Sequence, residues 1–220
     1  MADVETQGHC SLFKSPVAWP VVTGCERLTS GCDNCPTYWE YKKNGWNYHP
    51  KIHYGELKVP SERSEPTGFM VAAGSDLFHE AVTEHFIKSV FEIMAENPNH
   101  HFEIVSKRIE RMVAMSERGL QWPDNVVAAT AVEEAKYKWR IDALRELKAK
   151  KKMISFGPLI GKVGEIDMEG IDVAGVVVAT WGLNPRPAKQ EWIDEIITQC
   201  VFQGVLLSDD AWLMEEEVRV

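Results

Sequence analysis

Short apolar runs alternate with amphipathic segments from residue 68 to residue 207, and this alternation limits the possible folds. The run Gly68–Ala73 (GFMVAA) is typical of a buried strand, whereas Thr83–Glu96 carries its apolar residues at helical spacing. Strands that alternate with helices form a parallel sheet. Six or seven such units without a Gly-rich dinucleotide fingerprint favour an α/β fold, a partial (βα)6–7 TIM-like barrel. An open doubly wound sheet is the rival fold.

The same patterns predict the other elements of the chain. We expect strands at Val17–Val22, Phe102–Val105, Asn125–Ala131, Lys152–Phe156, Ala174–Ala179 and Gly204–Leu207, with a short one near Ile52–Val59. We expect helices at Tyr38–Trp46, Ile109–Arg118, Ala135–Lys148 and Lys189–Phe202. A Gly-containing loop, Gly157–Gly170, separates two of the strands.

Length and composition predict a single domain over residues 1–220, with an N-terminal arm (1–16), a long connection (47–67) and an acidic tail (213–220). The net charge of −9 argues against a protein that coats nucleic acid by bulk electrostatics, but it leaves room for a local basic patch. No run is apolar and long enough for a membrane span, and the first residues lack a signal-peptide pattern. We therefore expect a cytoplasmic protein without membrane contact.

Three of the five cysteines lie close together in the stretch Trp19–Tyr38, which reads WPVVTGCERLTSGCDNCPTY. Six residues separate Cys25 from Cys32, and two residues separate Cys32 from Cys35. An odd cysteine count with three clustered thiols suits a reducing compartment and a metal site better than a disulfide framework. We interpret this stretch as a metal-binding loop at the end of the first strand.

The residues leave three interpretations of the cysteine loop open. A zinc ion would need a fourth ligand, for which Cys10, His49 and His53 are candidates. An iron–sulfur cubane held by three thiolates would keep one iron open for a substrate or cosubstrate. The third interpretation is a set of unliganded structural cysteines.

Polar residues follow almost every predicted strand. In a parallel α/β fold these positions face one shared cavity, so we expect a site there. Loops are polar in any case, and this alone explains a polar residue after any one strand. It explains less well that polar residues after several strands converge on the same rim as three cysteines. The candidates are Ser75, Asp76, Ser106, Lys107, Arg108, Glu133, Ser155, Trp181, Asn184 and Arg186.

Several short motifs follow one another between Trp19 and Trp212, at intervals that match those of one enzyme family. Together they resemble the radical S-adenosylmethionine (SAM) enzymes of phages and prophages, long classed as uncharacterised phage proteins. The TGC-to-CxxC and DLFH pieces are the most specific. The motifs are Trp19–Cys35, Gly74–His79 (GSDLFH), Ser106–Arg108 (SKR) followed by Glu110–Met112, Ala131–Glu133 (AVE) and Gly157–Gly161 (GPLIG).

The resemblance implies a radical SAM barrel with a [4Fe–4S] cluster on the three loop cysteines and SAM on the open iron. It implies that the reduced cluster cleaves SAM to a 5′-deoxyadenosyl radical, which takes a hydrogen atom from a substrate. It also implies an electron donor of the flavodoxin or ferredoxin type. By this resemblance the expected SAM-binding residues are Ser75, Asp76, Ser106, Lys107 and Glu133.

The presumed substrate side of the cavity departs from the family pattern. Ser155–Pro158 reads SFGP where the family usually has Ser–Val–Glu–Pro, and Ala179–Gly182 reads ATWG where Gly–Gly–Glu–Ser is usual. Pro36–Thr37 also intervene before Tyr38, where the family has Tyr–Ala directly after the third cysteine. Two carboxylates are therefore missing and Trp181 is added, which suggests an unusual, flat substrate.

The phage association suggests a hypermodified thymine base in DNA as the substrate, with a small free metabolite as the competitor. A small basic rim of Lys107, Arg108, Arg186 and Lys189 could receive a flipped nucleotide. The expected substrate contacts are Arg108, Ser155, Trp181, Asn184 and Arg186. The rival function is a zinc- or cluster-stabilised binding protein without catalysis, and the sequence assigns no catalytic acid or base.

Overall fold

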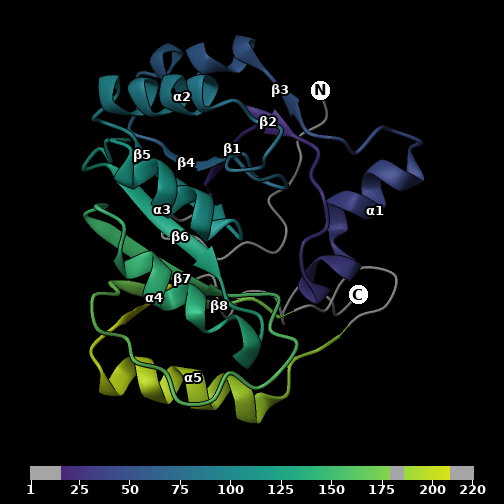
Figure 1. The fold of residues 1–220 in the computed structure, drawn as a ribbon, viewed down its shortest axis with the longest axis vertical. Helices are drawn as coiled ribbons and strands as arrows, with labels where there is room; N and C mark the ends of the chain where they lie inside the picture. The colour runs from purple at the N-terminus through teal and green to yellow at the C-terminus, as the bar shows by residue number, and fades with distance from the viewer. Residues whose placement is uncertain (1–15, 179–185, 209–220) are drawn as a thin grey trace.

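The computed structural model describes residues 16–178 and 186–208. Within them, seven strands form one sheet in the order β1-β4-β5-β6-β7-β8-β9, and each neighbouring pair is parallel (Figure 1). The strands are β1 (Val17–Trp19), β4 (Gly68–Val71), β5 (His101–Ser106), β6 (Val126–Ala131), β7 (Lys151–Phe156), β8 (Val173–Val176) and β9 (Leu206–Leu207). The predicted parallel α/β class is confirmed. Among the described residues the sheet stays open, with β1 and β9 at its two edges.

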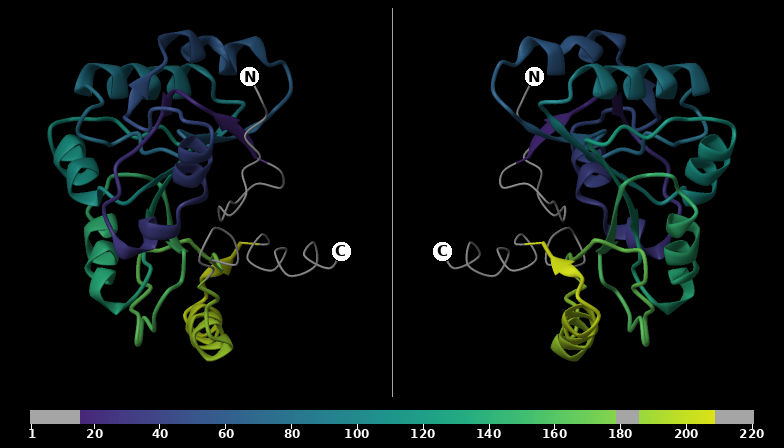
Figure 2. Two further views of the ribbon diagram at one scale, coloured as in Figure 1. Left: turned by 90° about the vertical axis from the view of Figure 1, so that its right-hand side faces the viewer. Right: turned by 90° about the vertical axis from the view of Figure 1, so that its left-hand side faces the viewer.

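Four of the five described α-helices cover the outside of this sheet. They follow one another from α2 at one end of the molecule to α5 at the other, whereas α1 lies apart from them (Figures 1 and 2). No helix in residues 16–178 or 186–208 is long and apolar enough to cross a membrane. The helices are α1 (Pro36–Lys43), α2 (Glu84–Glu96), α3 (Ile109–Glu117), α4 (Trp139–Arg145) and α5 (Gln190–Phe202).

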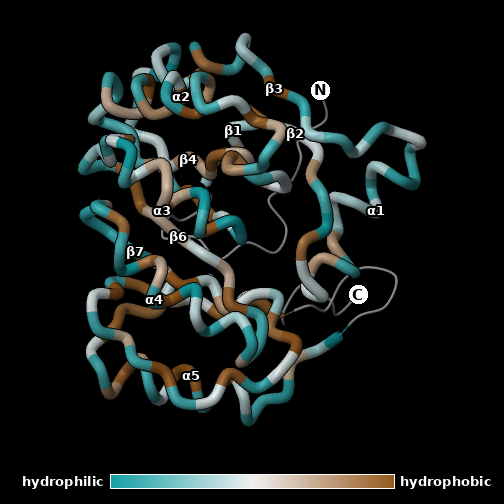
Figure 3. The backbone as a smooth tube through the Cα atoms, in the orientation of Figure 1, coloured by the Kyte–Doolittle hydropathy of each residue, from teal (hydrophilic) through white to brown (hydrophobic). Residues whose placement is uncertain are grey.

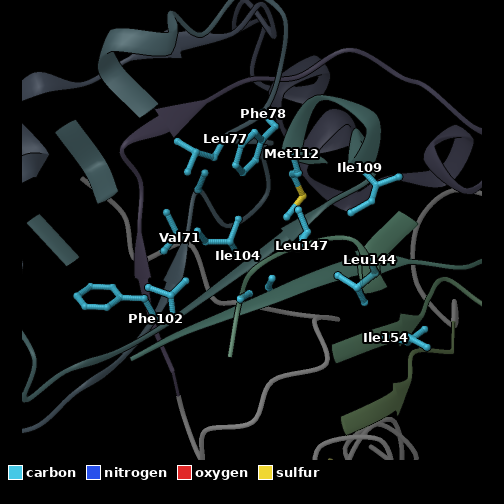
Figure 4. Close-up of a cluster of buried hydrophobic side chains, with 14 of the residues drawn as sticks. Val71, Leu77, Phe78, Phe102, Ile104, Ile109, Met112, Leu144, Leu147 and Ile154 are labelled. Carbon is cyan, nitrogen blue, oxygen red and sulfur yellow. The ribbon is translucent and has the colours of Figure 1, made fainter. Parts of the chain in front are cut away.

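The helical periodicity of the sequence becomes the packed face of each outer helix. In α2 the Thr83 side chain accepts a hydrogen bond from the Phe86 backbone N at 3.2 Å and caps the helix. Its buried side chains are Phe86, Ile87, Val90, Phe91 and Met94, all at the predicted helical spacing. Figure 4 shows such side chains from strands and helices meeting in one core, including Phe102, Ile104 and Met112. Each fully buried aliphatic or aromatic side chain contributes about 2 kcal/mol to stability.

Two predicted elements are divided in the structure. Pro20 separates the run Val17–Val22 into β1 and β2 (Val22–Thr23), because proline has no backbone N–H to donate to a sheet. β2 pairs antiparallel with β3 (Lys51–Ile52), and the expected strand beyond Ile52 is replaced by the short 3₁₀ helices η2 (Tyr54–Lys58) and η3 (Pro60–Glu62).

The predicted helix Ala135–Lys148 is also shorter than expected. It begins as the 3₁₀ helix η4 (Ala135–Tyr137) and continues as α4. Residues 157–172 connect β7 to β8 without a helix, in keeping with the predicted loop. The expected arm (1–16) and acidic tail (213–220) lie almost wholly outside the described residues.

The helix α1 differs from the other four in having no buried residue. Figure 3 shows mostly hydrophilic and intermediate colours along it, whereas the inner strands are largely hydrophobic. Its role is therefore not to cover the sheet. It is joined to the short 3₁₀ helix η1 (Ser30–Asn34) through Cys35, which is the N-cap residue of α1.

Candidate functional site

The cysteine loop begins at a position that only glycine can occupy. Gly24 has φ +73°, and a β-carbon there would lie 2.3 Å from the His49 carbonyl oxygen. This close approach lets the Cys25 backbone N donate to the Tyr48 carbonyl at 2.8 Å. The β2–β3 pair thus fixes the start of the loop, and η1 with the first turn of α1 carries the other two cysteines.

One cavity at the carboxyl ends of the strands receives all three thiols. The structure brings most of the predicted site residues to the same cavity. Its wall includes Cys25, Cys32, Cys35, Ser75, Asp76, Lys107, Arg108, Ser155 and Arg186. Ser106 and Glu133 are buried and are not part of its wall. Trp181 and Asn184 lie outside the described residues.

Two of the thiols have a cationic neighbour. Arg108 Nη1 lies 4.0 Å from Cys25 Sγ, and Lys107 Nζ lies 3.4 Å from Cys32 Sγ. Burial raises the pKa of Cys25 to about 12. Burial acts in the same direction on Cys32, but the Lys107 ammonium group and hydrogen bonds from Thr29 and the Leu28 backbone together outweigh it, and the pKa of Cys32 is lowered. Nearby positive charge favours the thiolate, which is the form that binds metals.

The third thiol has a neutral neighbour. The Tyr48 hydroxyl lies 3.8 Å from Cys35 Sγ. Burial and the neighbouring thiols raise the pKa of Tyr48, so the phenol keeps its proton. Edge-to-face contacts with Tyr38 and Tyr41, at centroid distances of 5.4 and 5.2 Å, hold the ring in place.

A buried carboxylate holds Lys107 in position. Lys107 Nζ lies 2.6 Å from Glu133 Oε1, and Arg140 Nη1 lies 3.1 Å from Glu133 Oε2. Thr29, in the cysteine loop, donates its hydroxyl proton to Glu133 Oε1. Burial acts against the charge of Lys107, but Glu133 and Cys32 together outweigh it, and the pKa of Lys107 is raised. The lysine therefore stays charged beside the cysteine loop.

Asp76 organises a second network on the other side of the cavity. Its Oδ1 accepts hydrogen bonds from the Ser106 hydroxyl at 2.7 Å and from the Phe78 backbone N at 2.9 Å. Its Oδ2 accepts from Arg108 Nη1 at 3.0 Å, and Arg108 Nε lies 2.9 Å from Glu80 Oε2. Asp76, although part of the cavity wall, is therefore already engaged with protein donors.

Two further predicted residues bind the backbone of the cysteine loop. Ser75 donates its hydroxyl proton to the Gly24 carbonyl oxygen. Arg186 Nη1 donates to the Ser30 carbonyl oxygen at 2.8 Å. Their predicted contacts with SAM and substrate stay predictions, but both side chains support the loop directly.

The three thiols do not converge on one point. Among residues 16–178 and 186–208, no three His, Cys, Asp or Glu side chains are grouped closely enough to hold one metal ion. In an iron–sulfur cubane each thiolate binds a different iron, so the sulfurs need not meet. The three thiols of the shared cavity fit the ligand set of such a cluster.

Residues 14–212 match a family described as a protein of unknown function (DUF5131). The chain belongs to the DUF5131 family. The comparison with curated proteins found no match for this DUF5131 chain.

Among solved structures, the DUF5131 chain is similar to spore photoproduct lyase. The complex of that lyase with dinucleoside spore photoproduct is 14% identical, with TM-score 0.52 over 88% of this chain and 63% of that one. A cysteine-to-alanine mutant of the lyase is 14% identical, with TM-score 0.54 over 92% of this chain and 79% of that one. A double mutant of the lyase with bound AdoMet and the same dinucleoside is 13% identical, with TM-score 0.51 over 88% of this chain and 63% of that one.

At this identity the likeness shows the fold alone. The predicted α/β fold with a parallel sheet is confirmed, and it resembles the fold of spore photoproduct lyase. The DUF5131 chain spans less than two thirds of the length of two of these three structures.

The sequence did not single out three residues of this site in the DUF5131 chain. Tyr48 lies in the long connection and reaches Cys35 only through the fold. Thr29 has no distinguishing motif. Arg140 did carry a signal, because it lies among the buried positions of α4 with Ile141 and Leu144. A buried arginine on an apolar helix face requires a carboxylate partner, and Glu133 provides it.

Proposed function

We propose that this DUF5131 protein is a radical SAM enzyme whose Cys25, Cys32 and Cys35 hold a [4Fe–4S] cluster, with one iron left for SAM. The observation that supports this proposal most is that all three thiols line one cavity at the carboxyl ends of a parallel sheet without converging on a single ion position. When bound and reduced, the cluster and SAM supply a 5′-deoxyadenosyl radical that abstracts hydrogen.

The protein's own contribution is to position ligands and exclude water. Apolar side chains from four strands and their ends line the cavity beside the thiols: Met70, Val71, Ala72, Val105, Ala131 and Val177. A dry wall protects a reactive intermediate and strengthens the electrostatic contacts around it. Such a lining suits chemistry that water would quench.

We assign direct contacts with SAM to the predicted residues that line the cavity. Lys107 is suited to pair with the SAM carboxylate, and Ser75 with Asp76 to bind its amine or ribose. Ser106 and Glu133 were expected to touch SAM as well. Because they lie behind the wall, we now assign them an indirect role through Asp76 and Lys107.

For the substrate we propose a nucleobase in DNA, as the resemblance to phage enzymes suggested. The similar lyase was solved with a dinucleoside photoproduct, which supports a nucleotide-sized ligand for this fold. Arg108, Ser155 and Arg186 line the cavity at positions suited to such a ligand. A small free metabolite is the competing substrate, and the net charge of −9 favours it. The reaction also needs a one-electron donor of the flavodoxin or ferredoxin type.

Anaerobic reconstitution with iron and sulfide tests the cluster assignment. We expect about four irons and four sulfides per chain in the wild type. Cys32→Ala should lose most of this content. Cys200→Ala is the matched control, because Cys200 lies on the buried face of α5, and it should retain the full content. Stoichiometric zinc without iron, or a full cluster in Cys32→Ala, would contradict the assignment.

A further inference from the structure

A chain of alternating buried charges ends at one of the three thiols. It runs from Arg140 through Glu133 to Lys107, and Lys107 Nζ lies 3.4 Å from Cys32 Sγ. The Glu133 side chain is fully buried, and that of Arg140 is 3% exposed. Two cations and one anion leave this chain of charged groups with a net positive charge. The Lys107 ammonium group at its end faces the sulfur of Cys32.

The other cation near the thiols is compensated locally. Arg108 Nη1 is 4.0 Å from Cys25 Sγ, but the same guanidinium lies within 3.0 Å of both Asp76 and Glu80. One cation with two anions leaves a net negative charge on that side. Cys35 has the neutral Tyr48 hydroxyl beside it. Among the described contacts to the thiols, Cys32 is therefore the one that faces a charged group with a net positive charge, through Lys107.

We infer that Lys107, which faces Cys32, would raise the reduction potential of a cluster bound by the three thiols, and that Glu133 and Arg140 hold Lys107 there as positioning residues. The inference rests on the proposed function. Reduction adds one electron, supplied by the flavodoxin- or ferredoxin-type donor, and so one negative charge. A fixed cation nearby stabilises the reduced state, and hydrogen bonds to cluster sulfurs act in the same direction.

This arrangement addresses a physical problem of the site. The neighbouring Asp76 and Glu80 carboxylates disfavour added negative charge near Cys25, and burial does so generally. Lys107 offsets this effect from the opposite side of the loop. The Glu133 carboxylate keeps its ammonium group in place, while Arg140 neutralises the cost of burying that carboxylate.

The test is a reduction potential measured without SAM. Wild type, Lys107→Met and Lys150→Met are reconstituted, their iron and sulfide are counted, and each is titrated with dithionite while the reduced cluster is followed by electron paramagnetic resonance. Lys150→Met is the matched control, because Lys150 is exposed, pairs with Asp124 and precedes β7 at the opposite end of the sheet. Lys107→Gln removes the charge but keeps a donor toward Glu133, so it replaces Lys107→Met if that variant does not fold.

The expected result is a lower potential in the Lys107 variant and an unchanged potential in Lys150→Met, with equal cluster content. Equal potentials in all three proteins at equal cluster content would overturn the inference and leave the proposed function intact. Failure of the wild type to bind a cluster would overturn both the proposed function and the inference. A structural role alone would change cluster content or stability, but not the potential of the intact cluster.

Discussion

Gly31 packs directly against the Glu133 carboxylate: a β-carbon at position 31 would lie 2.3 Å from Glu133 Oε1. The carboxylate cannot move away easily, because Lys107, Arg140 and Thr29 all bind it. The cysteine loop can therefore lie on this buried network only because residue 31 has no side chain. This contact connects the position of the thiols to a charge network built from β5, β6 and α4.

Substitution of Gly31 by alanine should displace the cysteine loop. We expect Gly31→Ala to bind far less iron than the wild type after reconstitution and to lose about 1–3 kcal/mol of stability, as overpacked sites do. Gly55→Ala is the control, since a β-carbon there meets nothing within 4 Å. A full iron content in Gly31→Ala would show that the loop does not depend on this contact.

Neutralising Glu133 should destabilise the folded protein strongly. Glu133→Gln leaves Lys107 and Arg140 without their buried counter-charge, and loss of one partner from a buried ion pair costs about 3–5 kcal/mol. Urea denaturation would measure the change. The control is Asp124→Asn, which breaks the exposed pair with Lys150 and should cost at most about 1 kcal/mol. Similar costs for the two variants would contradict this role of Glu133.

The strand–helix order could be predicted because it depends on local periodicity. The apolar spacing of α2 and the buried run of β6 follow from the sequence alone, and both appear where expected. The 3₁₀ start of the segment before α4 could not be predicted, since Ala135–Tyr137 fits a helical pattern as well. The break at Pro20 does have a sequence signal, because proline has no backbone N–H to donate to a sheet.

The site could be predicted only in outline. The parallel sheet brings Asp76, Lys107 and Glu133 together because their strands are neighbours, which the chain order already suggests. The sequence does not show which of these side chains line the cavity and which lie buried behind its wall. That depends on which way the Ser106 and Glu133 side chains turn. The contact of Tyr48 with Cys35 depends on the two-residue β2–β3 pairing, which has no sequence signal.

His79 should make stability depend on pH. Burial, together with the Arg108 charge, lowers the pKa of His79 in the folded state. The unfolded chain therefore binds more protons as the pH falls below the ordinary histidine value of about 6.5, and folding stability decreases there. We expect His79→Gln to lose less stability than the wild type between about pH 7 and pH 5.

Urea titrations at several pH values would measure this dependence. His85→Gln serves as the control because His85 is exposed, and it should follow the wild-type curve. If His79→Gln showed the same pH dependence as the wild type, the lowered pKa of His79 would not contribute to stability.

The most direct test of the radical SAM proposal is SAM cleavage by the reconstituted wild-type protein. The anaerobic protein is given SAM and dithionite, and 5′-deoxyadenosine and methionine are quantified against a sample of Cys32→Ala. We predict that the wild type forms both products and that Cys32→Ala forms neither. A protein that holds its full cluster but forms no 5′-deoxyadenosine would contradict the proposal and indicate a cluster kept for structure alone.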